Sequence, residues 1–190
     1  LLKVAKRDYQ RISTNELGFV IGPRLNAAGR LDDMTLGIEC LITDDEGRAI
    51  EIASELDRLN RQRREIEATM RDSALDQLAL NIKFQQPAQS VYSICLYDPN
   101  WHQGVIGLIA SRVKEKFHRP IIIFAPGNEG EIKGSGRSIA GINLRDAIDL
   151  VSKRNPRLIK KFGGHAAAAG LTIMEHDFQR FQAAFEQIAQ

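Results

Sequence analysis

The chain has 190 residues, of which 43% are hydrophobic and 26% charged, a composition typical of a globular protein with one or two domains. No apolar run approaches the roughly 20 residues that cross a bilayer, and no signal-peptide pattern opens the chain, so we expect a cytoplasmic protein. The net charge of +2 is unevenly distributed: residues 1–99 hold 13 Lys and Arg against 16 Asp and Glu, whereas residues 100–190 hold 13 against 8. The basic second half favours a polyanionic partner.

The first 42 residues give a mixed pattern. A Gly-Pro turn is predicted at Gly22 and Pro23, and a short Ala/Gly segment with Arg24, Asn26 and Arg30 follows it. Arg24 is either part of a structural elbow that seats the next helix or a cation that binds a ligand. The first residue is leucine rather than methionine, so we expect a fragment or a processed chain.

A long amphipathic helix is predicted over residues 44–80. The sequence TDDE at residues 43–46 fits a capping box, in which Thr43 caps an amide and Glu46 reaches back. Hydrophobic residues then recur at alternating spacings of three and four, which predicts a helix of about 35 residues and roughly 50 Å. A coiled coil is the alternative. The polar sequence QQPAQ within residues 81–90 predicts a domain boundary.

The second half alternates between strand and helix patterns. Strands are expected at residues 91–97, 120–125, 131–138 and 171–174, and helices at 104–117, 143–153 and 177–189. The sequence GNEG at residues 127–130 predicts a hairpin turn between two of the strands. This order of elements predicts an α/β domain built around a mixed sheet.

The two cysteines, Cys40 and Cys95, lie inside apolar runs and lack metal-ligand spacing. An unpaired cysteine packs as a small hydrophobe, and a reducing cytoplasm disfavours disulfides. We therefore predict two buried free thiols.

Residues 163–170 read GGHAAAAG and are the most informative segment of the chain. The adjacent glycines Gly163 and Gly164 allow the backbone to approach a ligand closely, and His165 can donate to an anion. The four alanines predict a slim helical turn beneath a bound group. An ordinary turn beside a core histidine is the alternative.

A second candidate site is the sequence GSGRS at residues 134–138. On a strand, Ser135 and Arg137 share one face, so a hydroxyl and a guanidinium can hold one phosphate together. The alternative is a solvated hairpin in which the glycines serve a turn. No phosphate-binding loop of the type GxxxxGK[ST] occurs in the chain.

Residues 101–107 read WHQGVIG and precede a predicted helix, whose free amides favour an anion. His102 lies in this segment, and Trp101 either stacks on a base or packs against the sheet. Farther along the helix, Arg112 either reaches a nucleic acid or pairs with Glu115. A basic run follows later in the chain and would steer a polyanion towards the glycines: Lys153, Arg154, Arg157, Lys160 and Lys161.

These motifs, together with GPRLNAAGRLDD at residues 22–33, resemble the RecJ family of single-strand-specific DNA exonucleases in the DHH phosphoesterase superfamily. The resemblance implies an α/β fold in which a mixed-sheet DHH-associated domain (residues 89–190) follows a connector helix and linker (43–88) and a remnant of the catalytic DHH domain (1–42). It also implies that Ser135 and Arg137 form the pocket for the terminal 5′ phosphate of a DNA strand.

Further residue roles follow from the same resemblance. His165 is implied as a catalytic residue that contacts the scissile or adjacent phosphate in the cleft. We also expect six further residues to bind nucleic acid: Gly163, Gly164, His102, Arg112, Arg24 and Arg30.

The family's chemistry needs two divalent ions, Mn²⁺ or Mg²⁺, held by aspartates and histidines. Those motifs belong to a more N-terminal region and are missing from this sequence, so we expect no metal ligands in the chain and no nuclease activity from it alone. The implied parent is a monomeric 5′-to-3′ exonuclease of DNA repair and recombination. Its partners would be single-stranded DNA with a 5′ end and single-strand-binding protein, without a membrane.

Two alternatives remain open at this point. One is a stand-alone module that binds a nucleotide or phosphate. The other is a DHH-family phosphoesterase that acts on short oligonucleotides or a nucleotide bisphosphate, which the long connector helix disfavours.

Overall fold

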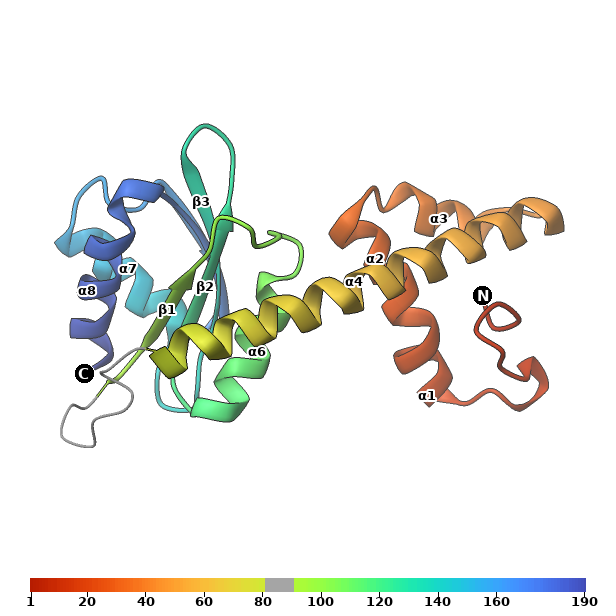
Figure 1. The fold of residues 1–190 in the computed structure, drawn as a ribbon, viewed down its shortest axis with the longest axis horizontal. Helices are drawn as coiled ribbons and strands as arrows, with labels where there is room; N and C mark the ends of the chain where they lie inside the picture. The colour runs from red at the N-terminus through yellow and green to blue at the C-terminus, as the bar shows by residue number, and fades with distance from the viewer. Residues whose placement is uncertain (81–90) are drawn as a thin grey trace. The chain divides into compact units, whose positions relative to one another are not determined.

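The computed structural model describes residues 1–80 and 91–190, which form two compact units, Leu1–Ile66 and Glu67–Gln190 (Figure 1). The division falls inside the long helix α4 (Glu46–Leu80), so this one helix contributes to both units. The boundary expected at residues 81–90 lies outside the described residues. The borders that the sequence suggests for three segments therefore stay predictions.

The first unit consists of the first part of α4 and of short helices. They are η1 (Tyr9–Arg11), α1 (Thr14–Glu16), the π-helical η2 (Leu17–Ile21), α2 (Gly22–Leu31) and α3 (Thr35–Ile42). The predicted Gly-Pro turn is wrong, because Gly22 and Pro23 form the first turn of α2. Proline is accepted there since the first amides of a helix have no partner within it.

The core of this unit lies between α2 and α4. Small side chains on α2 allow the two helices to approach, and larger ones from α4 fill the space between them: Ala27, Ala28, Ile52, Leu56 and Leu59. Cys40 packs at the border of this core and is only partly buried, unlike the fully buried thiol that we predicted.

The long helix is continuous over 35 residues, as its periodicity predicts. Its start differs from the prediction, because the helix begins at Glu46 and the capping box at residues 43–46 does not form. Asp45 instead accepts a hydrogen bond from the Arg48 amide at 3.1 Å, while Thr43 accepts one from the Asp45 amide at 3.3 Å. The first three residues of the TDDE pattern therefore form a turn that leads into the helix.

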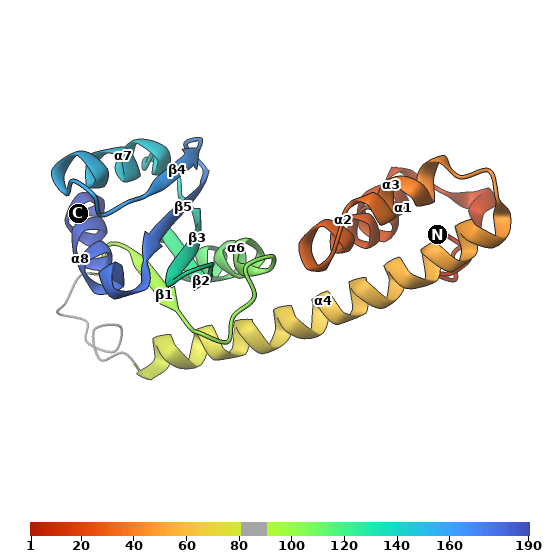
Figure 2. The same ribbon diagram turned by 90° about the horizontal axis from the view of Figure 1, so that it is seen from above.

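The second unit is built on a five-stranded mixed sheet with the order β1-β2-β3-β5-β4 (Figures 1 and 2). Its strands are β1 (Ile94–Tyr97), β2 (Ile121–Pro126), β3 (Glu131–Arg137), β4 (Lys161–Gly164) and β5 (Ala168–Met174). The β1 and β2 strands are parallel and all other pairs are antiparallel, which confirms the predicted mixed sheet.

Helices cover both faces of the sheet. The helix α6 (Ile106–Phe117) packs on β2 and β3 (Figure 2). On the opposite face, α7 (Leu144–Arg154), which Asn143 caps as predicted, and α8 (Phe178–Ala189) cover the main core. Within the described residues, no helix combines the length and the apolarity that a bilayer span requires.

The sequence pattern did not predict β4, and the helical turn predicted at the four alanines is wrong. Ala166 and Ala167 form a tight turn between β4 and β5 rather than a slim helix, and Ala168 already belongs to β5. Small residues carry no hydrophobic periodicity, so only pairing with β5 reveals this hairpin.

The main core lies between the sheet and the two C-terminal helices. Phe181 stacks on Phe185 with ring centroids 5.9 Å apart and meets Phe124 edge-on at 5.5 Å. Cys95 is fully enclosed in this core, and burial raises the pKa of its thiol, as expected for a structural cysteine.

Glu186 of α8 joins the start of β1 to this core. Its carboxylate accepts hydrogen bonds from the amides of Tyr92 and Ser93, at 2.7 and 2.8 Å, and from the Ser93 hydroxyl. Ser93 is buried, so loss of the carboxylate would leave buried donors without an acceptor.

We expect Glu186→Ala to lower the free energy of unfolding by roughly 2–3 kcal/mol, since the lost bonds are made to a charged acceptor. Urea denaturation followed by the fluorescence of Trp101, the single tryptophan, reports on this unit. The exposed neighbour Gln187→Ala is the control. Equal stability of the two variants would show that the carboxylate does not stabilise the strand.

Candidate nucleic-acid interface

Ser135 and Arg137 lie on one face of β3, as the sequence predicts. Arg137 Nη1 donates to the Gly136 carbonyl at 2.8 Å and to Ser135 Oγ at 3.3 Å, so the guanidinium and the hydroxyl are held together. Both side chains are half-buried. The pair therefore presents a fixed donor group rather than a freely moving arginine.

The glycines that alternate with this pair serve packing rather than a turn. A Cβ atom on Gly134 would lie 2.6 Å from the Phe124 ring, and one on Gly136 would lie 2.7 Å from Leu144. Both positions face the main core. The GSGRS motif is thus mid-strand, with one face shaped by the core and the other left for Ser135 and Arg137.

The first turn of α6 lies against the same pair. A Cβ atom on Gly107 would lie 3.0 Å from Arg137 Nη2 and 3.1 Å from Ser135 Oγ, so the glycine permits this approach. Within the described part of the chain, the Ile106 and Gly107 amides have no hydrogen-bond partner. A helix start of this kind favours an anion beside the arginine.

The sheet register extends this surface across two more strands. Ser135 pairs with Gly170 of β5, which in turn pairs with Gly163 of β4. A Cβ on Gly163 would meet nothing within 4 Å, and one on Gly170 would lie 3.7 Å from its nearest neighbour, the Gly134 carbonyl oxygen. Internal packing therefore does not require these two glycines, whereas a closely bound ligand would.

His165 lies at the end of the neighbouring row. Arg137 pairs with Ala168, and the His165 amide donates to the Ala168 carbonyl at 2.8 Å. Two strand spacings of ~4.8 Å put the Cα atoms of His165 and Arg137 about 10 Å apart. We name the surface formed by the following residues the open face: Ser135, Arg137, Gly163, His165, Ala168 and Gly170.

One backbone angle and two hydrogen bonds fix the turn beside His165. Gly164 has a φ of 147°, and the carbonyls of Ala166 and Ala167 accept hydrogen bonds from the amides of Leu144 and Ser138. The Ala167 amide also donates to His165 Nδ1 at 3.3 Å, which leaves Nε2 as the ring nitrogen available to a ligand. The histidine is exposed, which contradicts the alternative of a core residue.

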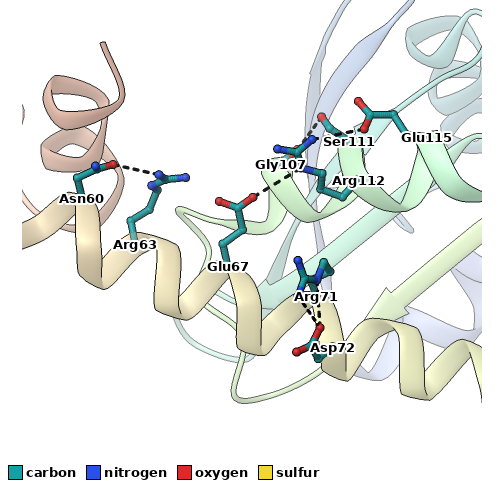
Figure 3. A network of polar contacts seen from close by, with 9 residues as sticks. All are labelled: Asn60, Arg63, Glu67, Arg71, Asp72, Gly107, Ser111, Arg112 and Glu115. Carbon is teal, nitrogen blue, oxygen red and sulfur yellow. Dashed lines mark hydrogen bonds and ion pairs between the residues drawn. The ribbon is translucent and has the colours of Figure 1, made fainter. Parts of the chain in front are cut away.

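Trp101 and His102 of the WHQGVIG segment make internal contacts. Trp101 is 6% exposed, and its indole N–H donates to Ser73 of α4 at 3.3 Å, so the ring packs rather than stacks on a base. His102 Nδ1 accepts from the Gly104 amide at 3.1 Å. Arg112 pairs with Glu67 and Glu115, at 3.8 and 3.6 Å (Figure 3). These contacts fit the pairing alternative for Arg112.

Arg24 and Arg30 lie on α2 of the first unit. The Arg24 guanidinium contacts Asp57 of α4 at 2.8 Å and the Val20 carbonyl at 2.8 Å, with only 13% of the side chain exposed. This arrangement fits the elbow that we weighed as the alternative. Arg30 lies in the last turn of α2 and is partly exposed.

Within residues 1–80 and 91–190, no three His, Cys, Asp or Glu side chains lie close enough together to hold a metal ion.

Residues 88–190 match the family described as the DHHA1 domain. This match covers more than half of the chain and includes all of β1 to β5 and the open face. The chain belongs to the DHHA1 domain family.

The chain is similar to several RecJ proteins in sequence and in structure. The single-stranded-DNA-specific exonuclease RecJ of Salmonella typhimurium is 49% identical over 189 residues, which are 99% of this chain and 32% of that protein. The crystal structure of RecJ from Thermus thermophilus with Mn²⁺ is 33% identical, has a TM-score of 0.81 and matches 100% of this chain and 26% of its own. Its complex with Mg²⁺ is 35% identical, with a TM-score of 0.77 over 92% of this chain and 25% of its own.

These matches confirm both the resemblance to RecJ and the predicted fold class. The chain spans about a third of the length of the Salmonella relative. The solved relatives hold Mg²⁺ or Mn²⁺.

Proposed function

We propose that this chain is the part of a RecJ-like 5′-to-3′ exonuclease that holds the 5′ end of a single DNA strand on the open face. The observation that carries the proposal is the row Ser135–Gly170–Gly163 beside Arg137, where a fixed guanidinium adjoins two glycines whose Cβ positions leave room for a ligand.

Each group on the open face has a defined task in this proposal. Arg137 and Ser135 donate to the terminal phosphate, and the first amides of α6 add positive potential. The glycines let the sugar-phosphate backbone lie against the sheet. His165 Nε2 donates to the next phosphate, which is a contact residue's role rather than that of a metal ligand.

The hydrolytic step belongs to the rest of the parent protein, which would bind Mn²⁺ or Mg²⁺ with residues outside this chain. The parent would act in the cytoplasm as a monomer in DNA repair and recombination, with single-strand-binding protein as a candidate partner. Nucleic-acid contacts by Arg24, Arg30, Arg112 and His102 belong to the same proposal, although their internal contacts make them weaker candidates than Arg137.

We expect the 190-residue chain to bind a 5′-phosphorylated single strand more tightly than the same strand with a 5′-hydroxyl or the same sequence as a duplex. Fluorescence anisotropy with a label at the 3′ end measures all three. The same strand incubated with Mn²⁺ or Mg²⁺ should remain intact, because the described residues supply no metal ligand set.

Two outcomes would contradict the proposal. Equal affinity for all three DNAs would show that the chain does not recognise a 5′ phosphate on a single strand. Metal-dependent release of nucleotides that survives repurification would show that this chain hydrolyses DNA by itself. A preference for free nucleotides over DNA strands would instead favour a stand-alone nucleotide-binding module.

A further inference from the structure

Three lysines gather around one carboxylate at the end of β3 that is far from Arg137. Lys160 Nζ donates to Glu131 Oε1 at 2.8 Å, and the register puts Lys133 and Lys161 on either side of Thr172. The hydrogen bond from Lys160 lowers the pKa of Glu131, burial opposes this, and the charges of the three lysines lower the pKa further. With three lysines around one carboxylate, the cluster has a formal charge of +2.

The cluster continues the open face. One face of β3 carries every second residue of the strand: Glu131, Lys133, Ser135 and Arg137. Lys133 and its paired residues on β5 and β4 therefore lie about 7 Å from Ser135 and its paired residues, at ~3.4 Å per residue. A hollow of about 230 Å³ spans the two rows on β4 and β5. It is lined by Lys161, Phe162, Gly163, Gly170, Leu171 and Thr172.

The charges in this cluster are not absorbed by internal pairing. Among the described residues, Lys133 and Lys161 form no salt bridge, and Lys161 is exposed. Lys160 has one acidic partner, and 45% of its side chain remains exposed. A lysine cluster with two exposed members, continuous with a candidate phosphate site, has the chemistry of a second phosphate contact.

We propose that Lys133, Lys160 and Lys161 form a second phosphate-binding subsite, which holds the backbone of a single strand beyond its 5′ phosphate. In the absence of DNA, Lys160 pairs with Glu131, and a bound phosphate would replace this carboxylate as its partner. The proposal rests on the function proposed above and adds the path that the strand takes along the sheet.

The two ends of the face differ in donor chemistry. Arg137 offers a planar fork that matches a terminal phosphate, whereas lysines are flexible point charges that suit internal phosphates of any sequence. Lys133 lies four residues from Arg137 on this face, about 14 Å at ~3.4 Å per residue, so one phosphate cannot contact both side chains. A mononucleotide bound at Arg137 is therefore too short to reach the lysines.

We expect Lys133→Gln/Lys161→Gln to leave the affinity for 5′-phosphorylated thymidine unchanged and to weaken binding of a 5′-phosphorylated thymidine hexamer roughly tenfold. The slope of log affinity against log salt should fall by about 1.4 for the hexamer, since each neutralised phosphate of a single strand contributes ~0.7. The charge-matched control is Arg145→Gln/Arg180→Gln, two exposed arginines on α7 and α8, which cover the opposite face of the sheet.

Glu131→Gln tests the cluster through an expected gain in affinity instead of a loss. Loss of the carboxylate frees Lys160, so the hexamer should bind roughly two- to fivefold more tightly while the mononucleotide is unaffected. A gain in affinity cannot come from a misfolded protein, so this variant separates the subsite from a loss of structure.

The outcomes distinguish the two proposals. If Arg137→Ala loses binding while the lysine and Glu131 variants leave the hexamer affinity and the salt slope unchanged, the second subsite is wrong and the proposed function stands. If the unmodified chain binds neither ligand, both proposals are wrong. An equal loss from the Arg145/Arg180 control would show a diffuse charge effect and would also overturn the subsite.

Discussion

Arg137→Ala should weaken binding of a 5′-phosphorylated single strand by about ten- to a hundredfold, while the same strand with a 5′-hydroxyl should lose much less. A charge-assisted contact contributes roughly 1.5–3 kcal/mol, which gives this range of affinity. The guanidinium is already positioned by Ser135 Oγ and the Gly136 carbonyl, so little order has to be gained on binding. Anisotropy with both strands at one salt concentration measures the effect.

Arg137→Lys is the matched control, because it keeps the charge and removes the planar fork. It should give an intermediate loss that is larger for the phosphorylated strand. Thermal unfolding of each variant checks that the bond to Gly136 is not needed for folding. Equal losses for both strands would mean that Arg137 contacts the backbone generally and does not recognise the terminal phosphate.

Gly164→Ala should destabilise the second unit by roughly 3 kcal/mol or more, because its backbone has a φ of 147° that L-residues rarely adopt. An added Cβ would also lie 2.4 Å from the Ala168 carbonyl oxygen. The turn that positions His165 cannot form with such a contact. Urea denaturation, followed by Trp101 fluorescence, gives the change in the free energy of unfolding.

Gly163→Ala is the control next to it, with the opposite expected result. Its Cβ would meet nothing within 4 Å, so stability should change by less than about 1 kcal/mol, while the methyl group on the open face should weaken binding of a phosphorylated strand. If both alanine variants destabilise the protein equally, Gly163 serves the fold and the open face is not shaped for a ligand.

The long helix and the strands of the sheet core could be predicted because their side chains are large and periodic. The helix from Glu46 to Leu80 and the buried run of β2 follow from spacing and from apolar content. The β4–β5 hairpin could not be predicted this way. Its residues are small, so its structure depends on hydrogen bonds to β3 and to the start of α7, which lie far away in the sequence.

The candidate site, too, could be predicted only in part from the sequence. The shared face of Ser135 and Arg137 follows from strand alternation, and the structure bears it out. The roles of the neighbouring glycines do not follow from the motif: Gly134 and Gly136 make room for the core, whereas Gly163 and Gly170 face outwards. Only the sheet register, which sequence spacing does not contain, separates the two pairs.

The position of β4 has a consequence for self-association. It is an edge strand, and flat edges rich in glycine are templates on which a second molecule can add a strand. This edge is only four residues long, begins with a lysine and ends at Gly164, just before the tight turn into β5. We therefore expect the chain to stay dispersed at high concentration, although two of the four residues of this edge strand have no side chain.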